Sequence, residues 1–314
     1  MSSDTLTLVR RQLRPFVDAG VFGNLEVHAA HRIVRAVRHD VDIEDSLAVA
    51  CAVWATQQGH VCFDLDDASI WRALRSHDTI DPDAWKQRVV TSPLVAQPES
   101  WDEPSDPLRP LVAFDHKLYL ARQWDDERSV ARSVRARLHR PAVSIDSSIF
   151  EDLFDEADRG GLQYVAVHRS LEVETSIVTG GPGTGKTYTI ARMLVAALRG
   201  GARRIAVAAP TAKAAVQLRE SLAGALSHAS LDAEHRAILD AVEPMTIHRL
   251  LGHRSGSVTR FRHDSHSTLA LDLVVMDEMS MVSLPLMARL LEALEPSTRL
   301  VLVDGFWAAD LSDA

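Results

Sequence analysis

The residues with the clearest chemical potential form a glycine-rich loop that follows the apolar run Ser176-Ile177-Val178. Glycines let the backbone turn its N–H groups inward around phosphate oxygens, and a helix that begins near Lys186 adds the positive end of its dipole. This spacing is the P-loop pattern, in which the lysine reaches the β and γ phosphates and the Thr187 hydroxyl binds Mg²⁺. The predicted ATP-binding residues are Gly180, Gly181, Pro182, Gly183, Thr184, Gly185, Lys186 and Thr187. Glycine-rich turns also precede helices without binding anything, but the flanking strand and helix favour the phosphate site.

Two adjacent acids, Asp277 and Glu278, follow a second apolar run roughly 90 residues beyond the loop. In P-loop hydrolases one acid in this place holds the Mg²⁺ shell and a neighbouring carboxylate orients the attacking water. Acids at strand ends can instead cap the following helix. With a P-loop upstream, the catalytic interpretation is favoured, so we predict Asp277 as a ligand of Mg²⁺, Glu278 as the group that activates water and Lys186 as the third catalytic residue.

The elements that must position these groups alternate between strand and helix after Glu172. The candidate strands are short apolar runs, typical of buried parallel sheets, at residues 175–179, 204–209, 271–276 and 299–303. The loop and the acid pair each follow one of these strands. Because the carboxyl ends of parallel strands line one crevice, we expect both in a single pocket of an α/β, doubly wound lobe.

The first half of the chain has a different, mainly helical pattern. Residues 5–74 are amphipathic, and the nearly all-apolar segment 46–54 predicts a core helix that Gly59 closes. Five prolines between residues 92 and 110 favour a surface excursion, and residues 110–120 predict a hairpin.

We therefore expect four parts along the chain. Charged residues at helical spacing from Arg122 to His139 predict a helix that leads into a connector. The expected parts are a smaller, mainly helical domain at 1–125, a helical connector at 126–170, the sheet lobe at 171–303 and a tail at 304–314.

The bulk composition excludes several classes of protein. A net charge of −9 argues against a uniformly basic DNA-binding face and confines any DNA contact to a local surface. Cys51 and Cys62 are too few for a zinc or iron–sulfur site and are expected to be buried free thiols. No stretch approaches a membrane span and no signal sequence begins the chain, so we expect a cytoplasmic protein with no membrane partner.

Three further segments point to one class of P-loop protein. Residues 209–215 resemble helicase motif Ia, residues 246–252 resemble the Thr-x-His element of superfamily-one helicases, and residues 277–282 resemble motif II of the RecD branch. Residues 59–65 and 118–124 look like parts of the RecD N-terminal domain. From about Ala48 to Val303 the chain is identified as a member of the RecD family, the α subunit of exodeoxyribonuclease V.

The resemblance implies a RecA-like, ATP-dependent helicase lobe that moves 5′ to 3′ on single-stranded DNA in double-strand break repair and recombination. It implies RecB and RecC as partners, with the nuclease centre in RecB. Contacts to the DNA backbone would fall on Pro210, Thr211 and His248, and Gln163 would read the adenine. Open alternatives are a core or capping role for His248, a helix cap for Thr211 and a solvated helix position for Gln163.

The family pattern breaks after Val303, where Asp304-Gly305-Phe306-Trp307 replaces an expected Gly-Asp pair with a nearby glutamine. We expect a chain truncated after its first RecA-like lobe, through a frameshift or premature stop, and inactive as a helicase. Motor function needs a second lobe with its arginine fingers. The alternatives are a non-catalytic subunit that docks on RecB–RecC, and a different P-loop enzyme such as a small-molecule kinase.

Overall fold

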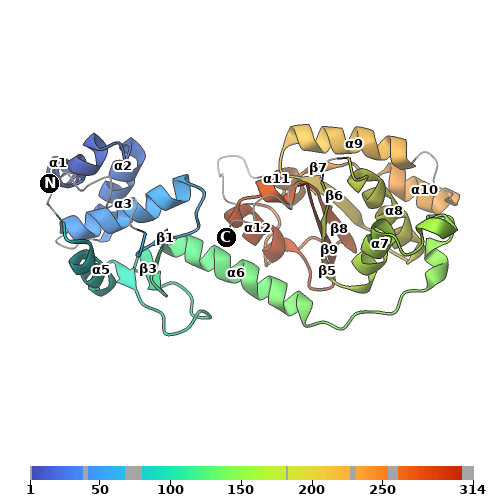
Figure 1. The fold of residues 1–314 in the computed structure, drawn as a ribbon, viewed down its shortest axis with the longest axis horizontal. Coiled ribbons are helices and arrows are strands. Elements are labelled where there is room, and N and C mark those ends of the chain that lie inside the picture. The colour runs from blue at the N-terminus through green and yellow to red at the C-terminus, as the bar shows by residue number, and fades with distance from the viewer. Residues whose placement is uncertain are drawn as a thin grey trace. The chain divides into compact units, whose positions relative to one another are not determined.

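The computed structural model describes residues 2–37, 42–67, 80–181, 183–226, 231–253 and 261–305, with side chains from residue 6 onward (Figure 1). The chain forms two compact units, which divide between Ser129 and Val130. Pro182 and the tail from residue 306 onward lie outside the described residues. In the part of the chain that the structure describes, no helix is long and apolar enough to cross a membrane.

Unit 1 combines helices with a small sheet. Its helices are α1 (Ser2–Asp18), α2 (Asn24–Val37), α3 (Ile43–Gln57) and α5 (Pro82–Thr91). Its strands are β1 (Phe63–Asp64), β2 (Val95–Ala96), β3 (Leu111–Phe114) and β4 (Lys117–Leu120), in the order β1-β4-β3-β2. The mainly helical character predicted for this part is confirmed. β2, however, lies within the proline-rich stretch, for which no strand was expected.

Helix α3 is the core of unit 1, as its apolar sequence predicts. Residues 47–53 are all buried, and the chain leaves the helix through Gly59, whose φ of 87° suits a residue without a side chain. The predicted hairpin is also present between β3 and β4. Asp115 and His116 both have positive φ, as a two-residue hairpin turn requires.

The two cysteines are free thiols in different environments. Cys51 is fully buried in α3, which raises the pKa of its thiol. Cys62 is only half-buried, so the expectation of a buried thiol is correct for Cys51 and wrong for Cys62. Among the described residues no group of three or more His, Cys, Asp or Glu side chains could hold a metal ion by itself.

Helix α6 (Ala121–Leu138) ends earlier than a helical connector to residue 170 would require. The chain from residue 139 to 161 holds only two short 3-10 helices, η1 (Ser147–Phe150) and η2 (Glu156–Asp158), before α7 (Leu162–Glu172) begins. Pro141 and the pair Gly160-Gly161 account for the irregular backbone, because proline interrupts a helix and Gly160 adopts a φ of 102°.

Unit 2 is built on a five-stranded sheet with the order β5-β9-β8-β6-β7, and all its strand pairs are parallel. The strands are β5 (Thr175–Thr179), β6 (Ile205–Ala209), β7 (Met245–Thr246), β8 (Leu273–Met276) and β9 (Arg299–Asp304). The four predicted strands are confirmed to within two residues. The short strand β7 was not predicted.

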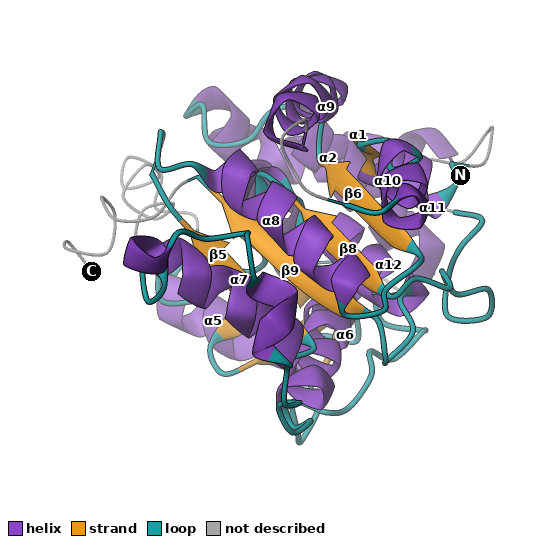
Figure 2. Cartoon of the chain, turned by 90° about the vertical axis from the view of Figure 1, so that its right-hand side faces the viewer, coloured by secondary structure: helices purple, strands orange, loops and turns teal. Residues whose placement is uncertain are grey.

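Helices cover both faces of this sheet, as the apolar strands require. Val207, Val275 and Val301 pack with α7, α8 (Lys186–Arg199) and α9 (Ala212–Leu226). Alternate residues such as Val274 and Leu300 pack on the other face with α11 (Ile247–Leu251) and α12 (Leu284–Ala293). Figure 2 shows the strands with α7 and α8 in front of them. The predicted α/β fold with a parallel-sheet lobe is thus confirmed.

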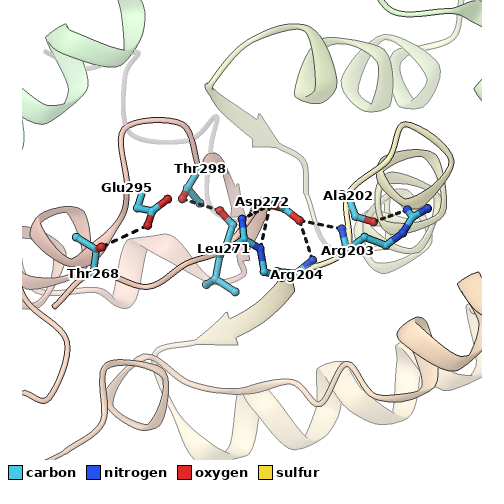
Figure 3. A network of polar contacts seen from close by, with 8 residues as sticks. All are labelled: Ala202, Arg203, Arg204, Thr268, Leu271, Asp272, Glu295 and Thr298. Carbon is cyan, nitrogen blue, oxygen red and sulfur yellow. Dashed lines mark hydrogen bonds and ion pairs between the residues drawn. The ribbon is translucent and has the colours of Figure 1, made fainter.

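A polar network ties the amino-terminal ends of β6 and β8 together (Figure 3). The Asp272 carboxylate accepts hydrogen bonds from the backbone N–H groups of Arg203 (2.8 Å) and Arg204 (2.9 Å) and from the Arg204 guanidinium (2.7 Å). Burial alone would raise the pKa of Asp272, but these donors outweigh it and lower the pKa to about 2. The carboxylate therefore stabilises the folded lobe at neutral pH.

We expect Asp272→Asn to lower the free energy of unfolding at pH 7 by about 1 kcal/mol, because a charged acceptor is lost at a partly exposed position. The unfolded carboxyl has the ordinary pKa of 3.8, so this contribution is full above that pH and disappears as the pH falls towards about 2. Urea unfolding at pH 7 and pH 2.5 measures both effects. The exposed Asp240 of the same unit gives the control variant Asp240→Asn. If the two substitutions lowered the free energy of unfolding equally at pH 7, the stabilising role of the Asp272 carboxylate would be contradicted.

Candidate nucleotide-binding site

The glycine-rich loop joins the carboxyl end of β5 to the first residue of α8, Lys186. Gly183 and Gly185 have φ values of 78° and 81°, which side chains rarely tolerate. A Cβ atom on Gly180 would lie 2.7 Å from Thr184 Oγ1, and one on Gly185 would lie 2.7 Å from Gln163 Nε2. The loop therefore needs glycine at these positions to keep its backbone N–H groups near the start of α8.

Lys186 lies over this loop. Its Nζ donates hydrogen bonds to the carbonyl oxygens of Gly180 (2.7 Å) and Gly181 (2.9 Å). The ammonium thus stands beside the amino terminus of a fourteen-residue helix, whose positive dipole end attracts anions. The Lys186 ammonium and the amino terminus of α8 therefore both place positive potential at the glycine-rich loop, so the residues present fit a phosphate group.

The acid pair follows β8, two strands away from β5 in the sheet. Burial raises the pKa of Asp277, and the neighbouring charges of Glu278 and Asp304 raise it further. The N–H of Glu278 (3.0 Å from Asp277 Oδ1) and the charge of Lys186 act in the opposite direction. Lys186 and the acids therefore interact electrostatically, and a divalent cation beside Asp277 would offset the cost of its burial.

The backbone of Glu278 is strained. Its φ of 55° and ψ of 49° lie in the left-handed region, which is uncommon for a residue with a side chain. The residue comes directly before the short 3-10 helix η3 (Met279–Met281), whose last residue donates its N–H to the Glu278 carbonyl (3.2 Å). Strain of this kind is often kept at functional sites, where it fixes the direction of a side chain.

Asp304 is a candidate site residue that the sequence prediction missed. It ends β9, pairs with Thr179 of β5, and its carbonyl accepts the N–H of Gly180 (3.2 Å). The residue thereby anchors the first residue of the glycine-rich loop, and its charge also acts on Asp277. An acid after an apolar strand was the available signal, the same signal that identified Asp277.

Gln163 lies against the loop, where its amide bridges two groups. Its Nε2 donates to the carbonyl of Thr184 (3.0 Å), and its Oε1 accepts from Arg192 Nη1 (2.8 Å). The Arg192 guanidinium stacks on the rings of Phe154 (4.3 Å) and Tyr188 (4.7 Å). Gln163 is therefore more than a solvated helix position, and Arg192 is a second candidate site residue that the sequence prediction missed.

The three candidate DNA contacts all lie near the carboxyl ends of β6 and β7. Pro210 follows β6 directly, and the Thr211 hydroxyl accepts the N–H of Ala214 (3.1 Å), so the capping alternative is confirmed for Thr211. His248 is exposed on α11, where Thr246 caps the helix by accepting the N–H of Arg249 (3.2 Å). His248 is thus neither a core nor a capping histidine.

The fold and the site together define a P-loop nucleotide-binding lobe of the RecA-like class. Its residues 163–305 match the family model described as an AAA domain, and residues 18–119 match the model of the RecBCD enzyme subunit RecD, N-terminal domain. The chain belongs to the RecD family.

Individual relatives agree with this assignment. The RecBCD enzyme subunit RecD of Mycolicibacterium smegmatis is 43% identical over 88% of this chain and 48% of its own length. The ATP-dependent RecD2 DNA helicase of Deinococcus radiodurans is 27% identical over 81% of this chain and 33% of its own length. The chain therefore spans half or less of these two curated relatives. The crystal structure of the UvsW helicase from bacteriophage T4 is a distant match, with 14% identity, a TM-score of 0.34, and coverage of 58% of this chain and 61% of that one.

Proposed function

We propose that this chain provides the ATP-binding lobe and the N-terminal domain of a RecD-type DNA helicase subunit. The observation that carries the proposal is the position of Lys186, whose ammonium lies over the glycine-rich loop and acts electrostatically on the half-buried Asp277. Gly180 to Thr187 would hold the phosphates, Lys186 would bind the β and γ phosphates, and Gln163 would contact the adenine.

Magnesium would be held by the Thr187 hydroxyl and the Asp277 carboxylate. A bound Mg²⁺ supplies positive charge that favours negative charge on the phosphate oxygens. Glu278 would accept a proton from the attacking water, with its direction fixed by the left-handed backbone. Asp304 would hold the loop through the N–H of Gly180.

The lobe would bind single-stranded DNA through Pro210, Thr211 and His248, in a motor that moves 5′ to 3′ during double-strand break repair and recombination. The Mycolicibacterium relative is named as a subunit of the RecBCD enzyme, and this supports RecB and RecC as partners. Within the proposal, residues 1–125 are the docking part, residues 126–170 the connector and residues 171–303 the motor lobe.

We expect the purified 314-residue polypeptide to bind ATP but to turn it over slowly, with no more than about twofold stimulation by single-stranded DNA. A second lobe supplies the arginines that accelerate hydrolysis by about 10³-fold or more in such motors. Phosphate release measured with and without an oligonucleotide tests this expectation, with Glu278→Gln as the inactive reference. Strong stimulation by DNA would contradict the expected inactivity.

The match of residues 18–119 to the RecD N-terminal domain supports a second candidate, a docking subunit without catalysis. This role predicts that the chain co-purifies with RecB and RecC whether or not Lys186 is replaced by alanine. Loss of both ATP binding and co-purification in a folded Lys186→Ala variant would argue against independent docking.

A further inference from the structure

Arg192 is held in one place on α8 by two aromatic rings. Tyr188 and Arg192 are four residues apart on this helix, so they share one of its faces. The Arg192 guanidinium lies 4.3 Å from the centre of the Phe154 ring and 4.7 Å from the centre of the Tyr188 ring. Guanidinium groups stack well on aromatic faces, and the stacking leaves their N–H groups available at the edge. The two rings therefore fix the direction in which Arg192 donates hydrogen bonds.

Gln163 receives one of these N–H groups. It lies in the first turn of α7, which packs beside α8 on one face of the sheet (Figure 2). Its Oε1 accepts from Arg192 Nη1 at 2.8 Å, and its Nε2 donates to the Thr184 carbonyl at 3.0 Å. The amide can come this close to the loop because Gly185 has no Cβ atom, which would lie 2.7 Å from Nε2. The Gln163 amide is thus held at one end by α8 and at the other by the glycine-rich loop.

The partners of this amide determine which way it faces. A guanidinium offers only donors, and a carbonyl offers only an acceptor. A flipped amide would place its NH₂ group against Arg192 and its oxygen against the Thr184 carbonyl, so both hydrogen bonds would be lost. Thr184 is exposed, and its carbonyl alone would hold the amide by a single neutral hydrogen bond. Arg192 supplies the second, charge-assisted bond, which makes one orientation strongly preferred.

The fixed amide keeps capacity for a ligand. A glutamine amide has two N–H groups and two oxygen lone pairs, and the bonds to Thr184 and Arg192 use one of each. A glutamine donor and acceptor together match N7 and the N6 amino group of adenine. Guanine has the O6 acceptor in place of that amino group, so it would face the amide oxygen without a hydrogen bond. An amide held in this orientation therefore favours adenine over guanine.

We propose that Arg192 is a positioning residue that sets the base specificity of the nucleotide site through Gln163. The inference rests on the proposed ATP-binding function, with Gln163 as the group that contacts the adenine. Arg192 acts on the base only through the Gln163 amide. Its loss should therefore weaken the recognition of adenine, whereas the glycine-rich loop and Lys186 should hold the phosphates as before.

The test compares the unmodified chain with three variants of the whole chain. Arg192→Leu removes the donor to Gln163 but keeps an apolar side chain beside the two rings, and Arg192→Lys restores a cationic donor at this position. Arg199→Leu is the matched control, because Arg199 lies on the same helix but donates to the carbonyls of Ile149 (3.1 Å) and Glu151 (2.6 Å). Each chain is titrated calorimetrically with ATP, GTP and inorganic tripolyphosphate in the presence of Mg²⁺.

The unmodified chain and Arg199→Leu should bind ATP about tenfold more tightly than GTP. In Arg192→Leu this ratio should fall below about threefold through weaker binding of ATP, while the affinity for tripolyphosphate changes by less than about twofold. Arg192→Lys should recover part of the ratio, because a lysine can donate to the amide oxygen but lacks the planar fork of arginine.

An ATP-to-GTP ratio that stays near that of the unmodified chain in Arg192→Leu would overturn the proposal. Equal losses of affinity for all three ligands would also overturn it, because damage to the structure of the lobe would act on the phosphates as much as on the base. Equal binding of ATP and GTP by the unmodified chain would refute the base specificity and leave the nucleotide site in place. If the unmodified chain bound neither ATP nor tripolyphosphate, the proposed function itself would fail, and this inference with it.

Discussion

Replacement of Lys186 by alanine is expected to weaken ATP binding by at least about 100-fold, which corresponds to about 2.7 kcal/mol. The Lys186 ammonium hydrogen-bonds to two carbonyls of the loop at 2.7 and 2.9 Å, and phosphate oxygens would offer it a stronger, charged partner. Alanine removes this cation but leaves the loop backbone and the dipole of α8 in place. Titration with a fluorescent ATP analogue measures the loss.

Lys213→Ala is the matched control for this prediction. Lys213 is an exposed lysine on α9 of the same lobe, so its loss makes the same change in charge away from the glycine-rich loop. Both variants should unfold at temperatures close to that of the unmodified chain, because neither side chain contributes to the apolar core. An Lys186→Ala variant that binds ATP as tightly as Lys213→Ala does would show that the loop is not the nucleotide site.

The substitution Asp277→Asn is expected to have two opposite effects. Nucleotide binding should lose its dependence on Mg²⁺, because the proposed carboxylate ligand becomes a neutral amide. Thermal stability at pH 7 to 8 should rise by a few degrees, because the lobe no longer holds a partly buried charge at this position. Titrations with and without Mg²⁺ and thermal unfolding of the nucleotide-free chain measure the two effects.

The stabilising effect expected for Asp277→Asn follows from the way the unfolding free energy depends on pH. Burial raises the pKa of Asp277 in the folded lobe above the value of 3.8 in the unfolded chain, so the folded state binds this proton more tightly. The unfolding free energy therefore falls as the pH rises from about 3.8 through the raised pKa, and Asp277→Asn escapes this fall. Its stabilising effect should vanish near pH 3. Glu278→Gln, which leaves the proposed metal ligand intact, should retain Mg²⁺-dependent binding. A destabilised Asp277→Asn chain that still requires Mg²⁺ would contradict both roles.

Much of the sheet could be predicted because its strands are short apolar runs between polar turns. The pattern at residues 175–179 has the same bounds as β5 in the structure. β7 has only two residues, Met245 and Thr246, which is too short for any periodicity to appear. The segment from 139 to 161 was expected to belong to a helical connector. It is irregular because Pro141 cannot continue a helix and Gly160 has a positive φ.

The glycine-rich loop could be predicted because its function requires particular residue types at fixed spacing. Arg192 and Asp304 could not be assigned in the same way, because their roles depend on neighbours that only the fold supplies. Arg192 contacts Gln163 across 29 residues of sequence, and Asp304 meets Gly180 because β9 inserts between β5 and β8. The role of Thr211, in contrast, depends only on its neighbours in the sequence, so the cap could already be considered as an alternative from the sequence alone.

Calorimetric titration of the purified chain with ATP, in the presence and absence of Mg²⁺, tests the proposed ATP-binding lobe most directly. We predict one bound ATP per chain, with tighter binding when Mg²⁺ is present, since the glycine-rich loop and Lys186 would hold the phosphates and Asp277 would bind the metal ion. A chain that is folded by circular dichroism and still shows no saturable binding of ATP under either condition would contradict this account.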